Sequence, residues 1–353
     1  MTVTTIPTVR SHGLFTETLR RSGTLFALLG FVLVVVLLAQ WGDVVLQRRV
    51  ILALINLVAV VGLFVFMGNS GVLNFSNVGF MAIGAYTSAL LTLPPSMKNT
   101  FLPDLPLWLA AIQLPTFSGA LAAGAVAGVI GLVAGWPLMR LSGIGAGIAT
   151  LSLLIICYIV LGNWNSVTGG QQSLMGLRTY VGLWTAGLWA MAAILVAYAY
   201  GETRFAIALR ASREDEVAAR ASGVRIVRQR LIAFVLGAVI SGVAGALYGH
   251  FLGTLRVELF YLDPTFLFIA MLVVGGMRSL TGAVVGTAAI SLLTELLRLS
   301  EVGFTLPGGL AVAAPAGLGD VVLAAVMLAI ILFRPQGITG GRELDRLLRL
   351  RTI

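Results

Sequence analysis

The apolar positions of this chain fall into long unbroken runs that short polar stretches separate. Most runs approach the length of about 20 residues at which a helix crosses the hydrocarbon core of a membrane. Ten runs have this character, and they cover residues 25–40, 50–67, 78–93, 117–139, 141–162, 181–200, 231–255, 265–277, 279–297 and 317–333. The pattern predicts an all-α fold, a polytopic transmembrane helical bundle with about 10 spans and a range of 8–11.

Some of these runs leave the number of crossings open. The third, eighth and tenth runs are short, and only Arg278 separates the eighth from the ninth. A broken or re-entrant pair over 265–297 is therefore an alternative to two complete crossings. A membrane β-barrel is not indicated, because its strands would alternate apolar and polar residues over about ten positions.

Composition excludes most soluble classes of protein. Apolar residues make up 58% of the 353 residues and charged residues only 10%, against about a quarter in an ordinary soluble domain. So few charges cannot cover the water-facing surface of a chain of this length. The single cysteine, Cys157, lies in an apolar run without a partner and is predicted to be a small buried hydrophobe.

The distribution of charge orients the spans. With the amino terminus inside and one crossing per run, 17 of the 23 basic residues fall inside, and six fall outside beside seven acids. This asymmetry follows the positive-inside rule and predicts that both termini are cytoplasmic. Arg48 and Arg49 are the main exception, because they fall outside. The net charge of +9 is thereby explained by topology, so no nucleic-acid partner is expected.

The same scheme divides the chain into parts. Residues 1–24 form a cytoplasmic segment, residues 25–338 form the transmembrane domain, and residues 339–353 form a basic cytoplasmic tail. The spans hold no histidine or paired carboxylate at mid-membrane, whereas ion-coupled transporters usually carry such groups. The sequence also has no Walker A motif and no metal-binding or catalytic constellation. We therefore expect a protein that is not an enzyme, holds no metal or cofactor, and takes its energy from another chain.

A charged loop over residues 201–230 interrupts the apolar pattern. Residues 211–221 are predicted to form a short helix with Glu214, Asp215 and Glu216 in its first turns, an order that suits the helix dipole. Gly223 follows as the expected terminator of this helix. The loop suits either a docking element for a cytosolic partner or an amphipathic helix that lies on lipid headgroups.

Several sequence stretches carry a resemblance to a known family. The loop reads RASREDEVAARASGV over 210–224 and continues into RLIAF. Further matching stretches are GNSGVLNFSNVGFMAIGAYTSAL (68–90), NWNSVTGG (163–170), GGMRSLTGAVVG (275–286) and FRPQG (333–337). Over residues 50–338 the chain thus resembles the permease subunits of branched-chain amino acid ATP-binding cassette importers, and in particular their larger, M-type subunit. It departs from that pattern at Arg278, where a small residue is usual, and at Asn77, where His or Gln is common.

The resemblance implies partners and sites. The expected partners are an H-type permease subunit, two cytoplasmic ATP-binding subunits that hold ATP and Mg, an extracytoplasmic substrate-binding protein and membrane lipid, in a bacterial inner membrane. The ATPase would dock on the loop. The docking residues implied by the resemblance are Glu214, Asp215, Glu216, Ala218, Ala219 and Gly223.

A translocation pathway would need polar groups at membrane depth. The candidates are Asn56, Asn69, Ser70, Asn74, Ser76 and Asn77. Such groups either satisfy the freed backbone of a broken helix or line a wet cavity. Thr168, Gly169 and Gly170 are candidates for an outer gate or a binding-protein contact, or else form a turn.

The expected substrate is a branched-chain or related small amino acid, carried by ATP-driven alternating access. The same family pattern admits urea and short amides, or small aromatic carboxylates. An ion-coupled secondary transporter is the alternative from another class, and it would need intramembrane titratable residues and inverted repeats.

Overall fold

The computed structural model describes residues 14–302, 304–305, 311–312, 318–334 and 336–343. The predicted all-α class is confirmed, because the strands among these residues are only two residues long and form two antiparallel pairs, β1–β2 and β3–β4. The elements are α1 (Leu14–Gln40), α2 (Val44–Ser70), α3 (Asn77–Thr92), α4 (Pro95–Phe101), α5 (Leu107–Ala111), α6 (Thr116–Leu138), α7 (Gly143–Asn163), α8 (Asn165–Thr168), β1 (Leu174–Met175), α9 (Leu183–Gly201), α10 (Arg204–Glu214), α11 (Glu216–Ala221), α12 (Ile226–Leu252), β2 (Thr254–Leu255), η1 (Val257–Phe260), α13 (Leu262–Gly275), α14 (Leu280–Val302), β3 (Phe304–Thr305), β4 (Ala311–Val312) and α15 (Leu318–Phe333).

Each of the ten predicted runs coincides with a helix. Within the described part of the chain, eight helices are long and apolar enough to cross a membrane. The runs at 78–93 and 317–333 form α3 and α15, which have only 16 residues each and fall below that length. The eight helices of spanning length fall within the predicted range of 8–11, whereas α3 and α15 are too short to bring the count to ten.

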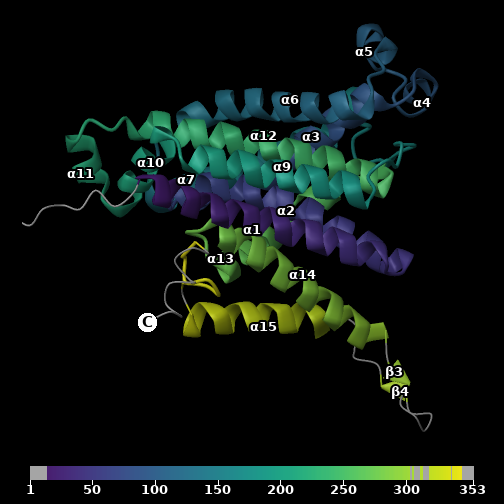
Figure 1. Cartoon of the computed structure of the whole chain (residues 1–353). Helices are drawn as coiled ribbons and strands as arrows, with labels where there is room; N and C mark the ends of the chain where they lie inside the picture. The colour runs from purple at the N-terminus through teal and green to yellow at the C-terminus, as the bar shows by residue number, and fades with distance from the viewer. Residues whose placement is uncertain (1–13, 303, 306–310, 313–317, 335, 344–353) are drawn as a thin grey trace, which may run out of the picture.

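The core of the bundle lies around α2 and α12. Buried side chains follow α2 continuously from Leu57 to its end at Ser70, and α12 packs against α2, α3 and α6. In Figure 1, α6, α12, α9, α2 and α1 lie in layers across the molecule, whereas α14 and α15 extend away from the layered part. Small residues allow this packing, since a Cβ on Gly245 would lie 1.8 Å from the carbonyl oxygen of Met81 on α3.

The two ends of the bundle carry different structures (Figure 1). One end carries α10 and α11, and the opposite end carries α4, α5 and the β3–β4 pair. The C-terminal segment returns to the first of these ends, because the amides of Ile338 and Thr339 donate to the carbonyl oxygens of Val274 and Gly275 at the end of α13, at 2.8 and 3.1 Å. Thr24 of α1 lines a cavity with Arg210 of α10, so the early part of α1 lies there too. Residues 1–13 and 344–353 of the predicted terminal segments lie outside the described residues.

The helices α13 and α14 form a close hairpin of two full-length spans. The 3-10 helix η1 extends α13, so the apolar stretch Val257–Gly275 has 19 residues, and the window Leu280–Leu299 of α14 has 20. A Cβ on Gly275 would lie 1.9 Å from the carbonyl oxygen of Gly282, which shows how closely the two backbones approach. The structure therefore favours two crossings here over a short re-entrant pair.

Candidate functional site

The charged loop folds into two short helices joined at Asp215. The Asp215 carboxylate accepts hydrogen bonds from the amides of Val217 at 2.8 Å and Ala218 at 3.0 Å, which are free donors in the first turn of α11. The prediction of one helix over 211–221 is wrong for this reason: α10 ends at Glu214, and Asp215 is its C-cap and the N-cap of α11. An aspartate that satisfies local amides competes with a continuous helix.

Glu216 holds α11 against the body of the bundle. Its carboxylate pairs with Arg220 at 2.5 Å and with Arg230 of α12 at 3.2 Å. Arg230 is 5% exposed, and it also donates to the carbonyl oxygen of Leu141 between α6 and α7. Glu216 therefore joins three parts of the chain, and its carboxylate is already engaged.

The remaining predicted docking residues differ in exposure. Ala219 is buried, whereas Ala218 and Gly223 are exposed, together with Val217 at 79%. Gly223 has a positive φ of 82° and ends the loop helix, where a glycine adopts the left-handed conformation without strain. The exposed surface of α11 is thus small, and it combines the apolar Val217 and Ala218 with the Arg220 side chain, which is 66% exposed.

The helix α10 is bonded to the end of α2. Arg210 donates to Asn69 Oδ1 at 3.0 Å and to the carbonyl oxygen of Gly201 at 2.8 Å. Arg213 donates to the carbonyl oxygen of Gly68 at 2.5 Å. Cations near a helix C-terminus interact favourably with its free carbonyl groups. The charge pattern of the sequence identified these arginines only as charges on the inner side. Their spacing of three residues, which places both on one helix face, was the signal that could have indicated a shared contact.

Between α2 and α3 the chain turns back along α2 without helical structure. Residues 71–76 connect Ser70 to Asn77, whose Nδ2 donates to the carbonyl oxygen of Ala59 at 3.2 Å. Ala59 lies eleven residues before Ser70, which is about 16 Å along a helix. Residues 71–76 therefore extend along α2 before α3 begins.

Buried polar side chains satisfy this extended segment. Asn74 Oδ1 accepts from the amide and hydroxyl of Ser76 at 3.0 and 2.7 Å, and Ser70 Oγ accepts from the amide of Val72 at 3.2 Å. Thr150 of α7, which the sequence did not suggest, accepts from the amide of Phe75 at 3.2 Å. Non-helical backbone at membrane depth needs such partners, because a buried polar group without one is costly.

Asn77 forms a buried polar contact with α12. The Ser241 hydroxyl lies 2.5 Å from Asn77 Oδ1 and 2.8 Å from the carbonyl oxygen of Gly237. Asn69, Ser70, Asn74, Ser76 and Asn77 are thereby brought together along one segment, all at most 4% exposed. Asn56 is not part of this group: it is half-buried, and it lies one helical turn before Ala59.

The predicted outer-gate residues form a tight turn after α8. The Thr168 hydroxyl, buried at 1% exposure, lies 2.6 Å from the carbonyl oxygen of Leu161 and accepts from the amide of Gly170 at 3.3 Å. Gly169 and Gly170 both have positive φ, at 75° and 64°. This turn lies at the end of the bundle opposite α10, close to Leu102, which follows α4.

Arg278 extends from the α13–α14 turn toward the loop. Its guanidinium lies 3.9 Å from the carboxylate of Glu214, with both side chains about 60% exposed. Beside it, Glu343 of the C-terminal segment accepts from the amides of Leu280 and Thr281, at 2.8 and 3.2 Å, and so caps the start of α14. No cluster of metal-ligating side chains occurs among the residues that the structure describes.

A comparison with protein families places this architecture. Residues 45–331 match the family described as "Branched-chain amino acid transport system / permease component". The chain belongs to this permease family. The match covers α2 to most of α15, including the segment between α2 and α3 and the α10–α11 loop. The permease is an integral membrane protein and a transport subunit without a catalytic role of its own.

Individual relatives agree with the family and differ in their named substrates. The permease is 28% identical to the high-affinity branched-chain amino acid transport system permease protein LivM of Salmonella typhimurium, over 86% of this chain and 72% of the relative. It is 27% identical to the probable branched-chain amino acid transport permease protein LivH of Methanocaldococcus jannaschii, over 90% and 99% of the two chains. It is also 25% identical to the nucleoside permease NupC of Lactococcus lactis, over 69% and 78%.

Proposed function

We propose that this permease is one of two membrane subunits of an ATP-binding cassette importer, and that the α10–α11 loop receives a cytoplasmic ATPase subunit. The observation that carries the proposal is the construction of α11. Its exposed surface at Val217 and Ala218 is apolar, while Glu216 and Arg230 fix its other side to α12. A small surface that is fixed to the bundle suits a partner whose movement must be transmitted to the membrane helices.

This assignment orients the molecule. The α10–α11 end, with the early part of α1 and the C-terminal segment, then lies in the cytoplasm, and the α4–α5 end lies outside. Both termini are cytoplasmic in this arrangement. It also places most arginines inside, as the positive-inside rule requires. Thr168, Gly169 and Gly170 would then lie outside, where a substrate-binding protein would approach the permease.

The proposed cargo is a branched-chain or related small amino acid. The family description and the names of the LivM and LivH relatives support this choice. A nucleoside is the second candidate, because the NupC relative carries that name. The polar segment from Asn69 to Asn77 is the proposed gate region of the pathway, since it is the extended backbone that lies beside both α10 and the middle of α2. ATP and Mg would be held by the partner subunits.

Co-purification from native membranes in mild detergent tests the assembly. We expect two ATP-binding subunits and a second permease chain to accompany this one. The purified complex, reconstituted in liposomes with its binding protein, should import radiolabelled leucine or valine only with ATP inside. Transport by this chain alone under an ion gradient would overturn the proposal, and uptake of nucleosides but not leucine would change the cargo.

A loop variant tests the docking surface. Val217→Glu places a charge on the exposed apolar surface of α11 and should abolish ATPase capture. Val217→Ile is the matched control and should retain it. Both variants leave the Glu216–Arg230 pair in place, so equal ATPase capture by the two would refute docking at α11.

A further inference from the structure

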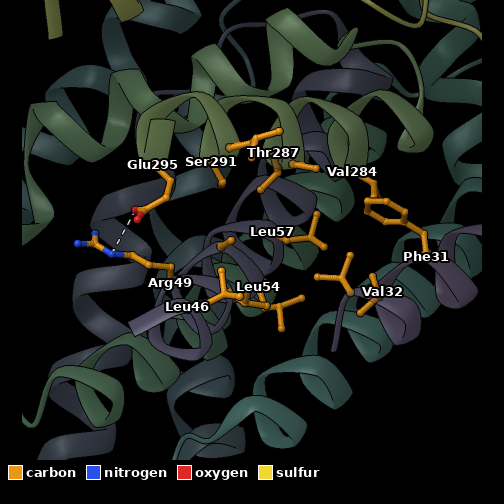
Figure 2. A pocket seen from close by; sticks show the side chains of 15 residues that line it. Phe31, Val32, Leu46, Arg49, Leu54, Leu57, Val284, Thr287, Ser291 and Glu295 are labelled. Carbon is orange, nitrogen blue, oxygen red and sulfur yellow. Dashed lines mark ion pairs between the residues drawn. The ribbon is translucent and has the colours of Figure 1, made fainter. Parts of the chain in front are cut away.

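An apolar groove runs between α1, α2 and α14 (Figure 2). Its volume is about 280 Å³, and its walls include Phe31, Val32, Leu54, Leu57 and Val284. Along α2 the lining extends from Leu46 to Leu57, which is about 16 Å of helix. Phe31 and Leu46 are 44% and 47% exposed, so the groove is open at the surface of the described chain.

Charged groups gather at one end of this groove. Glu295 of α14 pairs with Arg49 of α2 at 3.3 Å and with Arg298 at 2.5 Å (Figure 2 shows the first pair). Two guanidinium groups thus share one carboxylate. The neighbouring Arg48 of α2 lies over the ring of Phe251 on α12, at 5.8 Å from its centroid.

The ion-paired groups at this end of the groove, Arg49, Arg298 and Glu295, carry a net positive charge. The other carboxylate on α2 near this end is Asp43, at its N-cap. Two arginines, Arg49 and Arg298, share the single carboxylate of Glu295. Arg48 and Arg49 are also the residues that depart from the positive-inside pattern, and the transport function does not account for them.

The charged end lies at the level of a membrane interface. Trp41 follows the last residue of α1 and is 91% exposed, and tryptophan is enriched where the hydrocarbon core meets the headgroups. Arg49 lies in the second turn of α2, close to this level. The remaining length of the groove then runs inward at the depth of the acyl chains.

We propose that this groove binds one anionic diacyl phospholipid. One acyl chain lies along Leu57, Leu54 and Val284, and the phosphate lies at Arg49 and Arg298. An acyl chain is the apolar ligand that the bilayer supplies at this depth, and guanidinium groups bind phosphate oxygens through paired hydrogen bonds. The excess positive charge selects a lipid with a net negative headgroup over a zwitterionic one. The site needs neither ATP nor a docked ATPase, and its existence does not depend on the proposed transport function.

Native mass spectrometry of the purified complex tests the headgroup preference. The probes are phosphatidylglycerol and phosphatidylethanolamine with identical acyl chains. We expect phosphatidylglycerol to bind roughly fivefold more tightly, the effect of about one unpaired basic residue at a membrane surface. Arg49→Gln and Arg298→Gln should each remove this preference. Arg178→Gln, at an exposed arginine on the same end of the bundle, should keep it. Equal binding of the two lipids by the unaltered protein would overturn the proposal.

A second variant tests the groove itself. Ala288 lines the groove, so Ala288→Phe should fill it and lower the affinity for both lipids several-fold. Ala125→Phe adds the same ring at an exposed position of α6 and should leave binding unchanged. Melting temperatures verify that both variants are folded. Unchanged lipid binding in Ala288→Phe would exclude the groove.

A photo-crosslinking residue at position 288 identifies the occupant. In the complex within native membranes, an adduct with the mass of an anionic phospholipid supports the proposal. A covalent link to another polypeptide shows that a second subunit covers the groove, and this result overturns the proposal. Import activity is measured in parallel, so a loss of transport with intact lipid binding concerns the proposed function alone.

Discussion

Arg210 of α10 donates a hydrogen bond to Asn69 Oδ1 at 3.0 Å, across 141 residues of sequence. Three residues later on α10, Arg213 donates to the carbonyl oxygen of Gly68. The two contacts fasten the loop helix to the last turn of α2, directly before the extended segment 71–76. A displacement of α10 must therefore move the start of this segment or break these bonds.

This arrangement predicts a loss of coupling without a loss of assembly. Arg210→Gln and Arg213→Gln should each lower ATP-driven import roughly tenfold, because a hydrogen bond from a charged group contributes about 1.5–3 kcal/mol. The ATPase should still co-purify, since α11 is unchanged. The measurement is import per ATP hydrolysed in liposomes. Arg204→Gln is the control, because Arg204 is exposed and lies over the ring of Phe205. An equal loss of import in the control variant would contradict the role of the two contacts.

The cap between the two loop helices predicts a local effect. Asp215→Ala removes the acceptor for the amides of Val217 and Ala218 and should destabilise α11 by about 1 kcal/mol. Asp215→Asn retains a hydrogen-bond acceptor, so it should lose only a fraction of this stabilisation of α11. Hydrogen exchange of residues 216–221 measures the difference. Equal protection in the two variants would show that the cap does not hold the helix.

The buried contact between Asn77 and Ser241 predicts a cost in global stability. Ser241→Ala leaves the buried Asn77 carboxamide without the hydroxyl that donates to its Oδ1, at a cost of about 1–3 kcal/mol. Ser152→Ala removes a similar hydroxyl, bonded to the carbonyl oxygen of Ile148, from an exposed position on α7 and should change stability by less than about 0.5 kcal/mol. Thermal unfolding of the two variants in detergent measures the difference in stability. Similar melting temperatures for the two variants would argue against the structural importance of this pair.

The sequence was sufficient to predict the long apolar helices and the class of protein. Apolar runs determine where a chain can cross a membrane, so each predicted run coincides with a helix. The partners of the polar residues could not be predicted in the same way. Asn77 binds Ala59 and Ser241, and these contacts depend on how three helices pack. The break at Asp215 was missed because its neighbours all favour a helix, and only its hydrogen bonds divide α10 from α11.

Close helix packing predicts opposite effects for two glycines. A Cβ on Gly245 of α12 would lie 1.8 Å from the carbonyl oxygen of Met81, so Gly245→Ala must separate α12 from α3. We expect a destabilisation of at least about 2 kcal/mol. Gly145 of α7 has open space where a Cβ would lie, so Gly145→Ala should stabilise α7 by about 0.5–1 kcal/mol. Thermal unfolding of the two variants measures both effects, and a stable Gly245→Ala variant would contradict the close approach.

Lys98 predicts a pH dependence at the opposite end of the bundle. Its side chain is buried, and Nζ donates to the carbonyl oxygens of Leu109 in α5 and of Ile112, which joins α4 to α5 and to the residue that follows it. Burial lowers the pKa of Lys98 below its ordinary value of 10.5. The folded connection thus binds this proton less tightly than the unfolded one does. The stability of this connection should therefore rise with pH between the lowered pKa and 10.5. Below the lowered pKa, Lys98 is protonated in both the folded and the unfolded state, so it should cause no change of stability with pH.

Hydrogen exchange of residues 95–112 at a series of alkaline pH values measures this dependence, after correction for the intrinsic exchange rate. Protection should increase with pH in the unaltered permease. Lys98→Met removes the titrating group while keeping an unbranched side chain, so the slope should disappear in that variant. Lys98 also donates to two carbonyl groups, so the variant should show lower protection at every pH. A slope that persists in Lys98→Met would assign the titration to another group in this connection.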